Sequence, residues 1–359
     1  MPAYVRYTDD VETVQPGEAE TTEKIITTMQ AEERITRGHH GHSVRTSFGK
    51  SLGLLTGELR VYDNLPPELC QGLFAEPRTY PVLVRLSHAP GEYLPDTGVS
   101  SARAMSLKVF GVPGERLTGH DAPTQDFILS TGTTFPPATP SGFLRTASAL
   151  QKAARAPEAL KHAVSATARV TNAALNKVGL NAPNLDQFGH PPIHPLGEPY
   201  YSQAPLRFGE HVAKLAAIPA GTLRELGGQR IERGDDSDAL RTSVSEHFRT
   251  GSAEFDLAVQ LCTDLERMPV ENTSTEWSEA ESPYQPVARL ILPAQDAAER
   301  IAWEKALTFN PAHSLAAHRP LGGINRARLR AYTEMGALRL RENGASVPEP
   351  HSLDDLPSL

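Results

Sequence analysis

Short hydrophobic runs, separated by Gly, Pro, Asp and Asn, recur along the chain at intervals typical of antiparallel strands in a barrel. Each run has the length and composition of a single strand. The runs lie at 54–62, 79–87, 104–112, 126–131, 254–262 and 286–293. The wide interval between the fourth and fifth runs indicates that the barrel is split in the sequence.

Longer stretches of helical composition flank and interrupt these runs. In residues 18–36, acidic and basic side chains recur four positions apart, a spacing that supports a helix. A Pro-rich segment at 135–140 leads into an Ala-rich helical stretch at about 141–179, and further helical stretches lie at 297–308 and 323–342. The pattern predicts an α+β protein, with a barrel flanked by helices.

The same pattern predicts how the chain is divided. We expect an N-terminal arm and helix at residues 1–35 and a polar tail at residues 346–359. Between them, residues 36–345 form a single domain with a helical insertion at about 141–180.

Charge and composition exclude several classes of protein. With 43 acidic against 35 basic residues and a net charge of −8, the chain lacks the cationic surface of a nucleic-acid binder. Its two cysteines, Cys70 and Cys262, are too few for a disulfide framework. There is no signal-peptide pattern at the start and no apolar stretch of about 18 residues, so we expect a cytoplasmic protein without a membrane span.

Three short motifs resemble functional sites, but the sequence around each favours a structural role. The segment FGKS at 48–51 resembles the end of a phosphate loop, but Val44 stands where the first glycine is required. The histidines of GHHGH at 38–42 are interpreted as packed or solvated rather than as metal ligands, because no carboxylate or cysteine motif accompanies them. Cys70 has no evident base partner and is expected to be a small buried side chain.

The segment 324–341 concentrates five arginines around one tyrosine. On a helix, Arg328, Tyr332 and Arg339 share one face, because they lie four and seven positions apart. A guanidinium one turn from a phenol favours phenolate, a hard anionic donor suited to ferric iron. Arg339 is placed to meet a carboxylate such as a haem propionate. The alternative from spacing alone is a solvated basic helix with one packing tyrosine.

The spacing of Arg328, Tyr332, Glu334 and Arg339 resembles the proximal haem motif of catalases. Further segments are similar to the short catalase-related haem proteins, in the same order along residues 35–342. They are 65–92, 124–132, 198–214, 256–277 and 309–328. The resemblance implies a catalase-like antiparallel eight-stranded β-barrel with flanking helices, haem b as cofactor, and no C-terminal flavodoxin-like domain.

The resemblance also implies roles for individual residues. Tyr332 corresponds to the axial ligand of the haem iron, and Arg328 to the partner of its phenolate. Three arginines correspond to groups that bind the propionates, and two aromatic residues lie near the haem, the second stacking on it. These residues are Arg45, Arg85 and Arg339, and Phe135 and Phe143.

The distal side departs from the family. Catalases have R-x-x-H-x-K where this chain has RTSFGK, so Phe48 stands in place of the distal histidine. Ser130 stands in place of the distal asparagine. Neither residue replaces an imidazole as a proton-transfer group. An alternative is that His39, His40 or His42 folds back over the haem.

These departures predict a haem-dependent peroxidase or peroxygenase with weak or no catalase activity, acting on peroxide, an organic hydroperoxide or another oxidised small molecule. One alternative is a haem-dependent isomerase or lyase resembling allene oxide synthase, and another is a non-catalytic haem-binding sensor. The expected partner is a small-molecule substrate, and catalase relatives suggest a homodimer or a higher oligomer. The sequence leaves the substrate and the role of residues 145–179 open.

Overall fold

The computed structural model describes most of the chain. The described residues are 3–89, 91–96, 99, 101–155, 160, 164, 165, 167, 168, 171, 189–232, 234, 236–345 and 349–356. Much of the Ala-rich stretch that the sequence predicts as helical, including most of 156–179, lies outside them.

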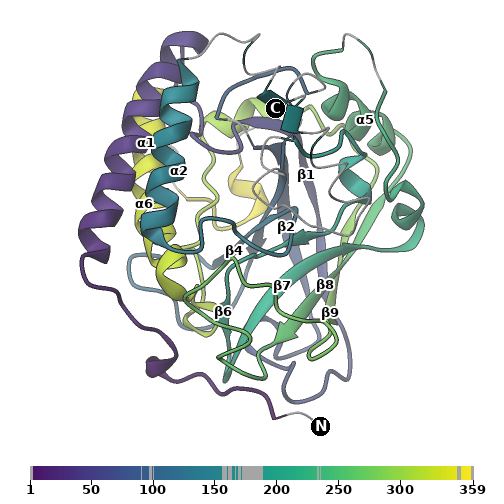
Figure 1. Ribbon diagram of the computed structural model, residues 1–359. Coiled ribbons are helices and arrows are strands. Elements are labelled where there is room, and N and C mark those ends of the chain that lie inside the picture. Colours follow the sequence, from purple (N-terminus) through teal and green to yellow (C-terminus); the bar gives the residue numbers. More distant parts are fainter. Residues whose placement is uncertain are drawn as a thin grey trace.

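A closed antiparallel barrel forms the centre of the molecule (Figure 1). Its strands follow the order β5-β4-β3-β2-β1-β9-β8-β7, and β5 pairs with both β4 and β7, which closes the ring of eight. A ninth strand, β6, extends the sheet beside β7. The strands are β1 (Lys50–Val61), β2 (Thr79–His88), β3 (Arg103–Phe110), β4 (Thr124–Ser130), β5 (Tyr200–Tyr201), β6 (Leu206–Phe208), β7 (His211–Pro219), β8 (Ala253–Leu261) and β9 (Gln285–Leu292). The predicted eight-stranded barrel, split in sequence, is confirmed.

Three helices stand side by side against one side of the barrel (Figure 1). They are α1 (Glu18–His40), α2 (Pro140–Ala154) and α6 (Gly322–Glu342), and a fourth helix, α5 (Ala239–Phe248), packs on β1. Short 3-10 turns are η1 (Asp9–Val11), η2 (Gly72–Phe74), η3 (Pro195–Gly197), η4 (Gly221–Leu226), η5 (Ile301–Lys305), η6 (Ala316–His318) and η7 (Leu353–Asp355). None of the described helices has the length and apolar character needed to cross a membrane.

Ion pairs hold α1 parallel to α6. Arg326 binds Glu18 at 2.6 Å and Arg330 binds Glu23 at 2.7 Å near the beginnings of the helices. Near their ends, Arg37 of α1 pairs with Glu342 of α6. The two helices therefore keep one register along their whole length.

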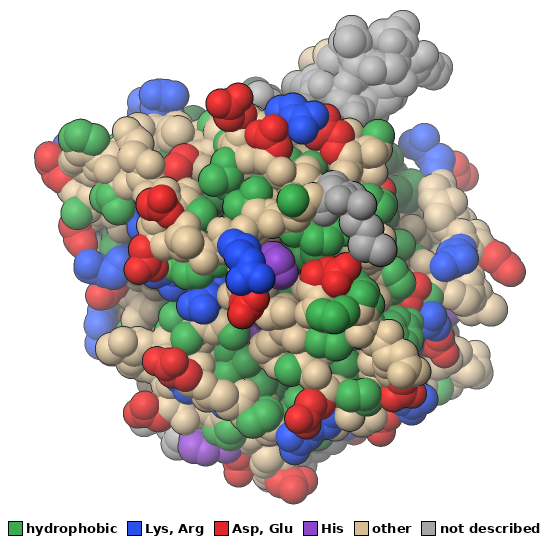
Figure 2. Space-filling view, turned by 90° about the horizontal axis from the view of Figure 1, so that it is seen from below, with side chains coloured by type: hydrophobic (Ala, Val, Ile, Leu, Met, Phe, Trp, Pro, Cys, Tyr) green, Lys and Arg blue, Asp and Glu red, His purple; other side chains and the backbone are tan. Residues whose placement is uncertain are grey.

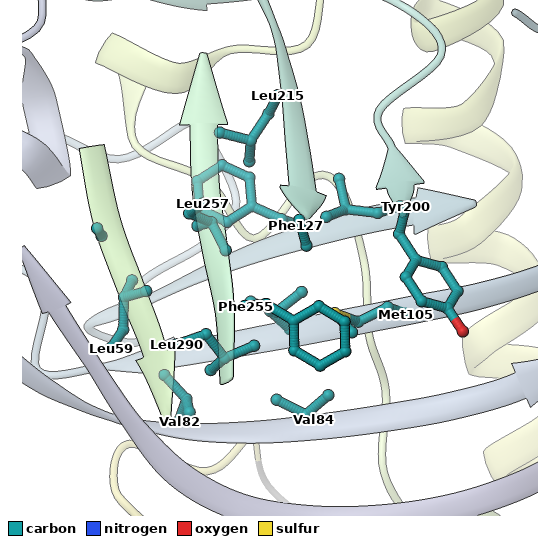
Figure 3. Packing of buried hydrophobic residues seen from close by; sticks show 14 of the residues in the cluster. Leu59, Val82, Val84, Met105, Phe127, Tyr200, Leu215, Phe255, Leu257 and Leu290 are labelled. Carbon is teal, nitrogen blue, oxygen red and sulfur yellow. The ribbon is translucent and has the colours of Figure 1, made fainter. Parts of the chain in front are cut away.

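The barrel interior is filled by aliphatic and aromatic side chains from facing strands (Figure 3). Phe127, Phe255 and Met105 pack together with Leu257 and Leu290 in this cluster. Burial of such side chains contributes on the order of 2 kcal/mol each. The barrel is thus a packed core, and the candidate site lies outside it.

One predicted helix is much shorter in the structure. Residues 297–308 contain only the 3-10 turn η5. In a longer helix, the backbone carbonyls of this segment would accept hydrogen bonds from backbone amides. Here the carbonyls of Glu304, Lys305 and Leu307 accept hydrogen bonds from the side chain of Arg339 instead. Tertiary hydrogen bonds therefore replace the expected helical ones in this segment.

Both terminal segments lie against the barrel. In the N-terminal arm, the amide of Val5 donates to the carbonyl of Cys262 at 2.8 Å and that of Tyr7 to Glu210 at 2.7 Å. In the C-terminal segment 349–356, Leu353 and Leu356 pack against a small apolar cluster that includes Leu54. The division at residues 35 and 345 stays a prediction.

Acidic and basic side chains are interspersed on the face of the molecule seen in Figure 2. Neither sign gathers over any large part of the described residues on that face. It does not present the uniformly basic surface that nucleic-acid binders use to contact phosphates.

Candidate active site

A cavity of about 580 Å³ lies between the barrel and the three-helix layer. Its wall is formed by residues 46–48, by β4 and the loop that follows it, and by side chains of α1, α2 and α6. It brings together six residues that the sequence singles out: Phe48, Ser130, Phe135, Phe143, Arg328 and Tyr332. Apolar side chains dominate the rest of the wall, among them Ile25, Ile128, Leu150 and Ile324.

Helix α6 presents Tyr332 and Arg328 to the cavity. The guanidinium carbon of Arg328 lies 5.5 Å from the centre of the Tyr332 ring, which is cation–π distance. Arg328 also donates from Nη1 to Oδ1 of Asn325 at 2.9 Å. Asn325 is fixed in turn, since its Nδ2 donates to the carbonyls of Pro205 and Leu321. Sequence reasoning missed Asn325, although it lies one turn before Arg328 on the same helix.

Phe48 lines the cavity from a left-handed backbone conformation, with φ of 55°. A bulky side chain seldom adopts this conformation, and it persists only where the surroundings enforce it. Here the Phe48 amide donates to the carbonyl of Ala89 at 2.8 Å, and the Phe48 carbonyl accepts from Nη2 of Arg85 at 2.8 Å. Backbone contacts on both sides therefore hold the phenyl ring at the cavity wall.

Ser130 ends strand β4 and lines the cavity, but its hydroxyl is engaged. Oγ donates to the backbone carbonyl of Arg103 at 3.0 Å. The Ser130 proton therefore stabilises the pairing of β3 with β4.

The loop after β4 carries Phe135, whose ring centre lies 5.7 Å from that of Phe143 on α2, with the planes inclined at 44°. Gln203 fixes this loop by donating from Nε2 to the carbonyls of Thr131, Gly132 and Thr134. Gln203 itself lies in the left-handed region, with φ of 60°. Nothing in the local sequence pattern marks Gln203, because its partners lie about 70 positions earlier in the chain.

The three arginines expected to meet carboxylates do not line the cavity. Arg45, Arg85 and Arg339 gather instead around the segment 304–307, behind the stretch of backbone that carries Phe48. Arg85 links the two places, because its Nη2 group contacts the carbonyls of Phe48 and Gly49. We refer to Arg45, Arg85 and Arg339 as the arginine cluster.

The three guanidiniums of the arginine cluster are close together, and burial disfavours their charged form. Burial lowers the pKa of Arg45 well below the usual range, and the neighbouring guanidiniums of Arg339 and Arg85 lower this pKa further. Burial also lowers the pKa of Arg339 to about 10. The carboxylate within the cluster is that of Glu304, which sequence reasoning missed because it lies in the segment expected to be helical.

The histidines of the GHHGH segment lie beside Tyr93 and Glu92. Nδ1 of His39 is 3.2 Å from Oε1 of Glu92, and the rings of His40 and His42 lie 4.8 and 5.8 Å from that of Tyr93. None of the three is among the described residues of the cavity wall. Burial, together with Glu304, raises the pKa of Tyr93 to about 12, so its hydroxyl keeps its proton.

Two other residues considered in the sequence have structural roles. Lys50 is buried and pairs with Asp96 at 2.8 Å and with Asp238 at 2.9 Å, so its ammonium is not placed to bind a phosphate. Cys70 is only partly buried, and its Sγ donates to the carbonyl of Leu65.

Comparison with known proteins identifies the architecture. No protein-family model matches the sequence, and no curated protein matches it. Among solved structures, a fungal catalase matches with a TM-score of 0.61 at 17% identity, over 85% of this chain and 61% of that one. The chain has the catalase fold.

Two further catalases support this assignment. Catalase A from Saccharomyces cerevisiae matches with a TM-score of 0.57 at 15% identity, over 84% of this chain and 63% of that one. A bacterial catalase gives 0.55 at 15% identity, over 85% and 59%. The chain therefore spans about three fifths of the length of these catalases. The catalase fold expected from the sequence is confirmed.

Proposed function

We propose that this protein is a haem-dependent oxidoreductase with Tyr332 as the axial iron ligand, acting on organic hydroperoxides or other oxidised small molecules and only weakly on hydrogen peroxide. The observation that carries the proposal is the pairing of Tyr332 with Arg328 at the wall of a large apolar cavity, beside a buried arginine cluster. The catalase fold supports it, because the neighbours are catalases.

The side chains present fit haem b. Tyrosine is a known proximal ligand of haem iron, and a neighbouring guanidinium favours the anionic form. The arginine cluster carries three positive charges against the one negative charge of Glu304. This excess of positive charge lies behind the Phe48 backbone and not on the cavity wall, so the fit to haem rests on Tyr332, on Arg328 and on the large cavity that they line.

When bound, haem would supply the redox chemistry for a peroxide bond. The residues around the haem would determine which peroxides react. Phe48 excludes water from the cavity wall and has no proton to exchange, and the hydroxyl proton of Ser130 is held by the Arg103 carbonyl. Because a well-placed imidazole contributes roughly 10²–10⁴-fold as an acid–base catalyst, we expect poor disproportionation of hydrogen peroxide.

The apolar wall favours a second candidate, a haem-dependent isomerase or lyase. Phe135, Phe143 and Leu150 offer contact area to an organic substrate rather than donors to water. A rearrangement without net oxidation needs no external electron donor, which separates it from a peroxidase.

The test is to load the protein with haem, record its absorption spectrum, and mix it with hydrogen peroxide or an organic hydroperoxide. Oxygen release at rates of authentic catalases would contradict the proposal. Hydroperoxide loss that requires a reducing substrate supports the peroxidase, and loss without one supports the isomerase or lyase. A haem complex that is unreactive to both would instead indicate a sensor.

A further inference from the structure

Helix α1 places a methionine on the wall of the cavity. Met29 lines the cavity together with Ile25 and Glu32, which lie four positions before it and three after it and so share one face of the helix. Met29 is only partly buried. It is therefore in contact with the space that a ligand of the cavity would fill.

The other methionines that the structure describes lie elsewhere. Met105 and Met268 are fully buried, and Sδ of Met268 accepts hydrogen bonds from the amide and the hydroxyl of Thr263 at 3.4 and 3.6 Å. Met335 on α6 is partly buried, as Met29 is, but it is not among the described residues of the cavity wall. Met29 and Met335 are thus a matched pair that differs in contact with the cavity.

A thioether on this wall can react with a hydroperoxide without any metal. The sulfur lone pair attacks the terminal oxygen of the hydroperoxide, an S–O bond forms and the O–O bond breaks. The hydroperoxide proton passes to the departing alkoxide, which leaves as an alcohol. The sulfur is oxidised to the sulfoxide and the peroxide is reduced, so the step needs no other reactant.

The apolar wall selects which oxidant reaches Met29. A hydroperoxide with an apolar body is drawn into the cavity, where it is held close to the sulfur. Hydrogen peroxide has no apolar body and gains nothing from the cavity. The sulfoxide is polar, and it would lie among apolar wall residues such as Ile25 and Ile324. Oxidation of Met29 therefore lowers the apolar character of the wall.

We propose that Met29 is a modification site: organic hydroperoxides held in the cavity oxidise it to the sulfoxide, and the modified wall binds apolar ligands less tightly. The inference rests on the proposed function only in that organic hydroperoxides enter the cavity, and it needs no haem.

The test treats the full-length protein, without haem, with cumene hydroperoxide or with hydrogen peroxide. Peptide mass spectrometry measures the rate of sulfoxide formation at Met29 and at Met335. The ratio of the Met29 rate to the Met335 rate should be roughly tenfold larger with cumene hydroperoxide than with hydrogen peroxide, the factor that burial of about two methylene groups supplies. An equal or smaller ratio overturns the proposal.

A second measurement shows whether the oxidant reaches Met29 through the cavity. Cumene, the parent hydrocarbon without the peroxide bond, should slow oxidation of Met29 by cumene hydroperoxide and leave that of Met335 unchanged. Equal protection of both residues, or protection of neither, would mean that the reaction does not depend on occupation of the cavity and contradicts the proposal.

The effect on binding is measured with the neutral apolar dye phenylnaphthylamine, by fluorescence titration before and after treatment. Treatment should weaken binding to the wild type but not to Met29→Leu, which keeps a similar volume and has no sulfur. Weaker binding in both proteins, or in neither, would show that the sulfoxide does not control the cavity. If Met29→Leu does not fold, as judged by circular dichroism, wild type treated in the presence of cumene and then freed of it is the control.

The two proposals fail in different ways. A haem-loaded protein that is unreactive to organic hydroperoxides, with selective oxidation of Met29 in the haem-free protein, removes only the proposed function. A haem-loaded protein that turns over organic hydroperoxides, with Met29 and Met335 oxidised alike, removes only the modification site.

Discussion

Glu349, in the C-terminal segment, forms an ion pair with Lys108 of strand β3. Lys108 is fully buried and also contacts both carboxylate oxygens of Asp126, at 2.8 and 2.9 Å. His313 completes the group, with Nδ1 3.0 Å from Glu349 and 3.4 Å from Asp126, and its ring stacks on that of His120. Two carboxylates thus face a lysine and a histidine, and the C-terminal segment is held on the barrel by charge.

This contact predicts a pH-dependent attachment of the C-terminal segment. Although burial opposes it, Asp126 and Glu349 raise the pKa of His313 to about 9. A raised pKa contributes stability that is complete below the ordinary histidine value of about 6.5 and is lost as pH rises through about 9. The effect is on the order of 3 kcal/mol. The protection of the amides of residues 349–356, relative to their intrinsic exchange rates at each pH, should therefore fall between pH 6.5 and 9.

The acid side of the same contact has the opposite sign. Despite burial, His313 and Lys108 lower the pKa of Glu349 to about 2, so its contribution is complete above about pH 4.5 and is lost as pH falls through 2. Glu349→Gln should reduce the alkaline pH dependence, whereas Asp354→Asn, at an exposed position of the same segment, should not. Equal exchange rates in wild type and Glu349→Gln from pH 6 to 10 would rule the attachment out.

Phe48→His should increase oxygen release from hydrogen peroxide by roughly 10²–10⁴-fold in the haem-loaded protein. The left-handed backbone at this position accepts histidine more readily than most bulky residues. Phe48→Leu serves as the control, since it opens the cavity without adding a base. A gain in both variants would mean that access limits the reaction, and no gain in either would mean that another group already transfers the proton.

Tyr332→Phe should weaken binding of ferric haem by more than the roughly 10–100-fold that loss of a supporting residue costs a metal site. Arg328→Gln, which removes the guanidinium beside the phenol, should stay within that range. Absorption titration measures both variants, and the position of the Soret band shows whether the ligand has changed. A Tyr332→Phe protein with the wild-type spectrum would exclude this tyrosine as the ligand.

Arg326→Leu should destabilise the fold by about 3 kcal/mol, because it removes the cation shared by three carboxylates. Arg326 binds Glu12 at 2.7 Å, Glu18 at 2.6 Å and Glu271 at 3.0 Å, which joins the N-terminal arm, α1 and α6. Arg330→Gln is the matched control on the same helix. Its pair with Glu23 is more than half exposed, so its loss should cost less than about 1 kcal/mol in urea unfolding.

The barrel and the face of α6 could be predicted because their signals are local. Strand runs are bounded by turn residues, and the spacing of Arg328 and Tyr332 along a helix fixes their common side. The surroundings of the arginine cluster could not be predicted. Arg85 and Glu304 lie over 200 positions apart, and nothing in the helical composition around Glu304 indicates that its carbonyls are used by Arg339.

Residue 48 shows the same contrast between local signals and contacts made by distant residues. The spacing of RTSFGK predicts that Phe48 stands in place of the distal histidine of catalases, since Arg45 and Lys50 fix the alignment. The left-handed conformation of Phe48 could not be predicted, because it depends on contacts with Ala89 and Arg85.

The backbone conformation of residue 48 is held by contacts that do not involve its side chain. The two hydrogen bonds that hold residue 48 involve only its amide and carbonyl, so they persist whichever side chain it carries. β-Branched residues are penalised there, while histidine, asparagine and glycine are tolerated. A lineage could therefore exchange a proton-transferring ring for an inert one by changing a single side chain, without rebuilding the scaffold around it.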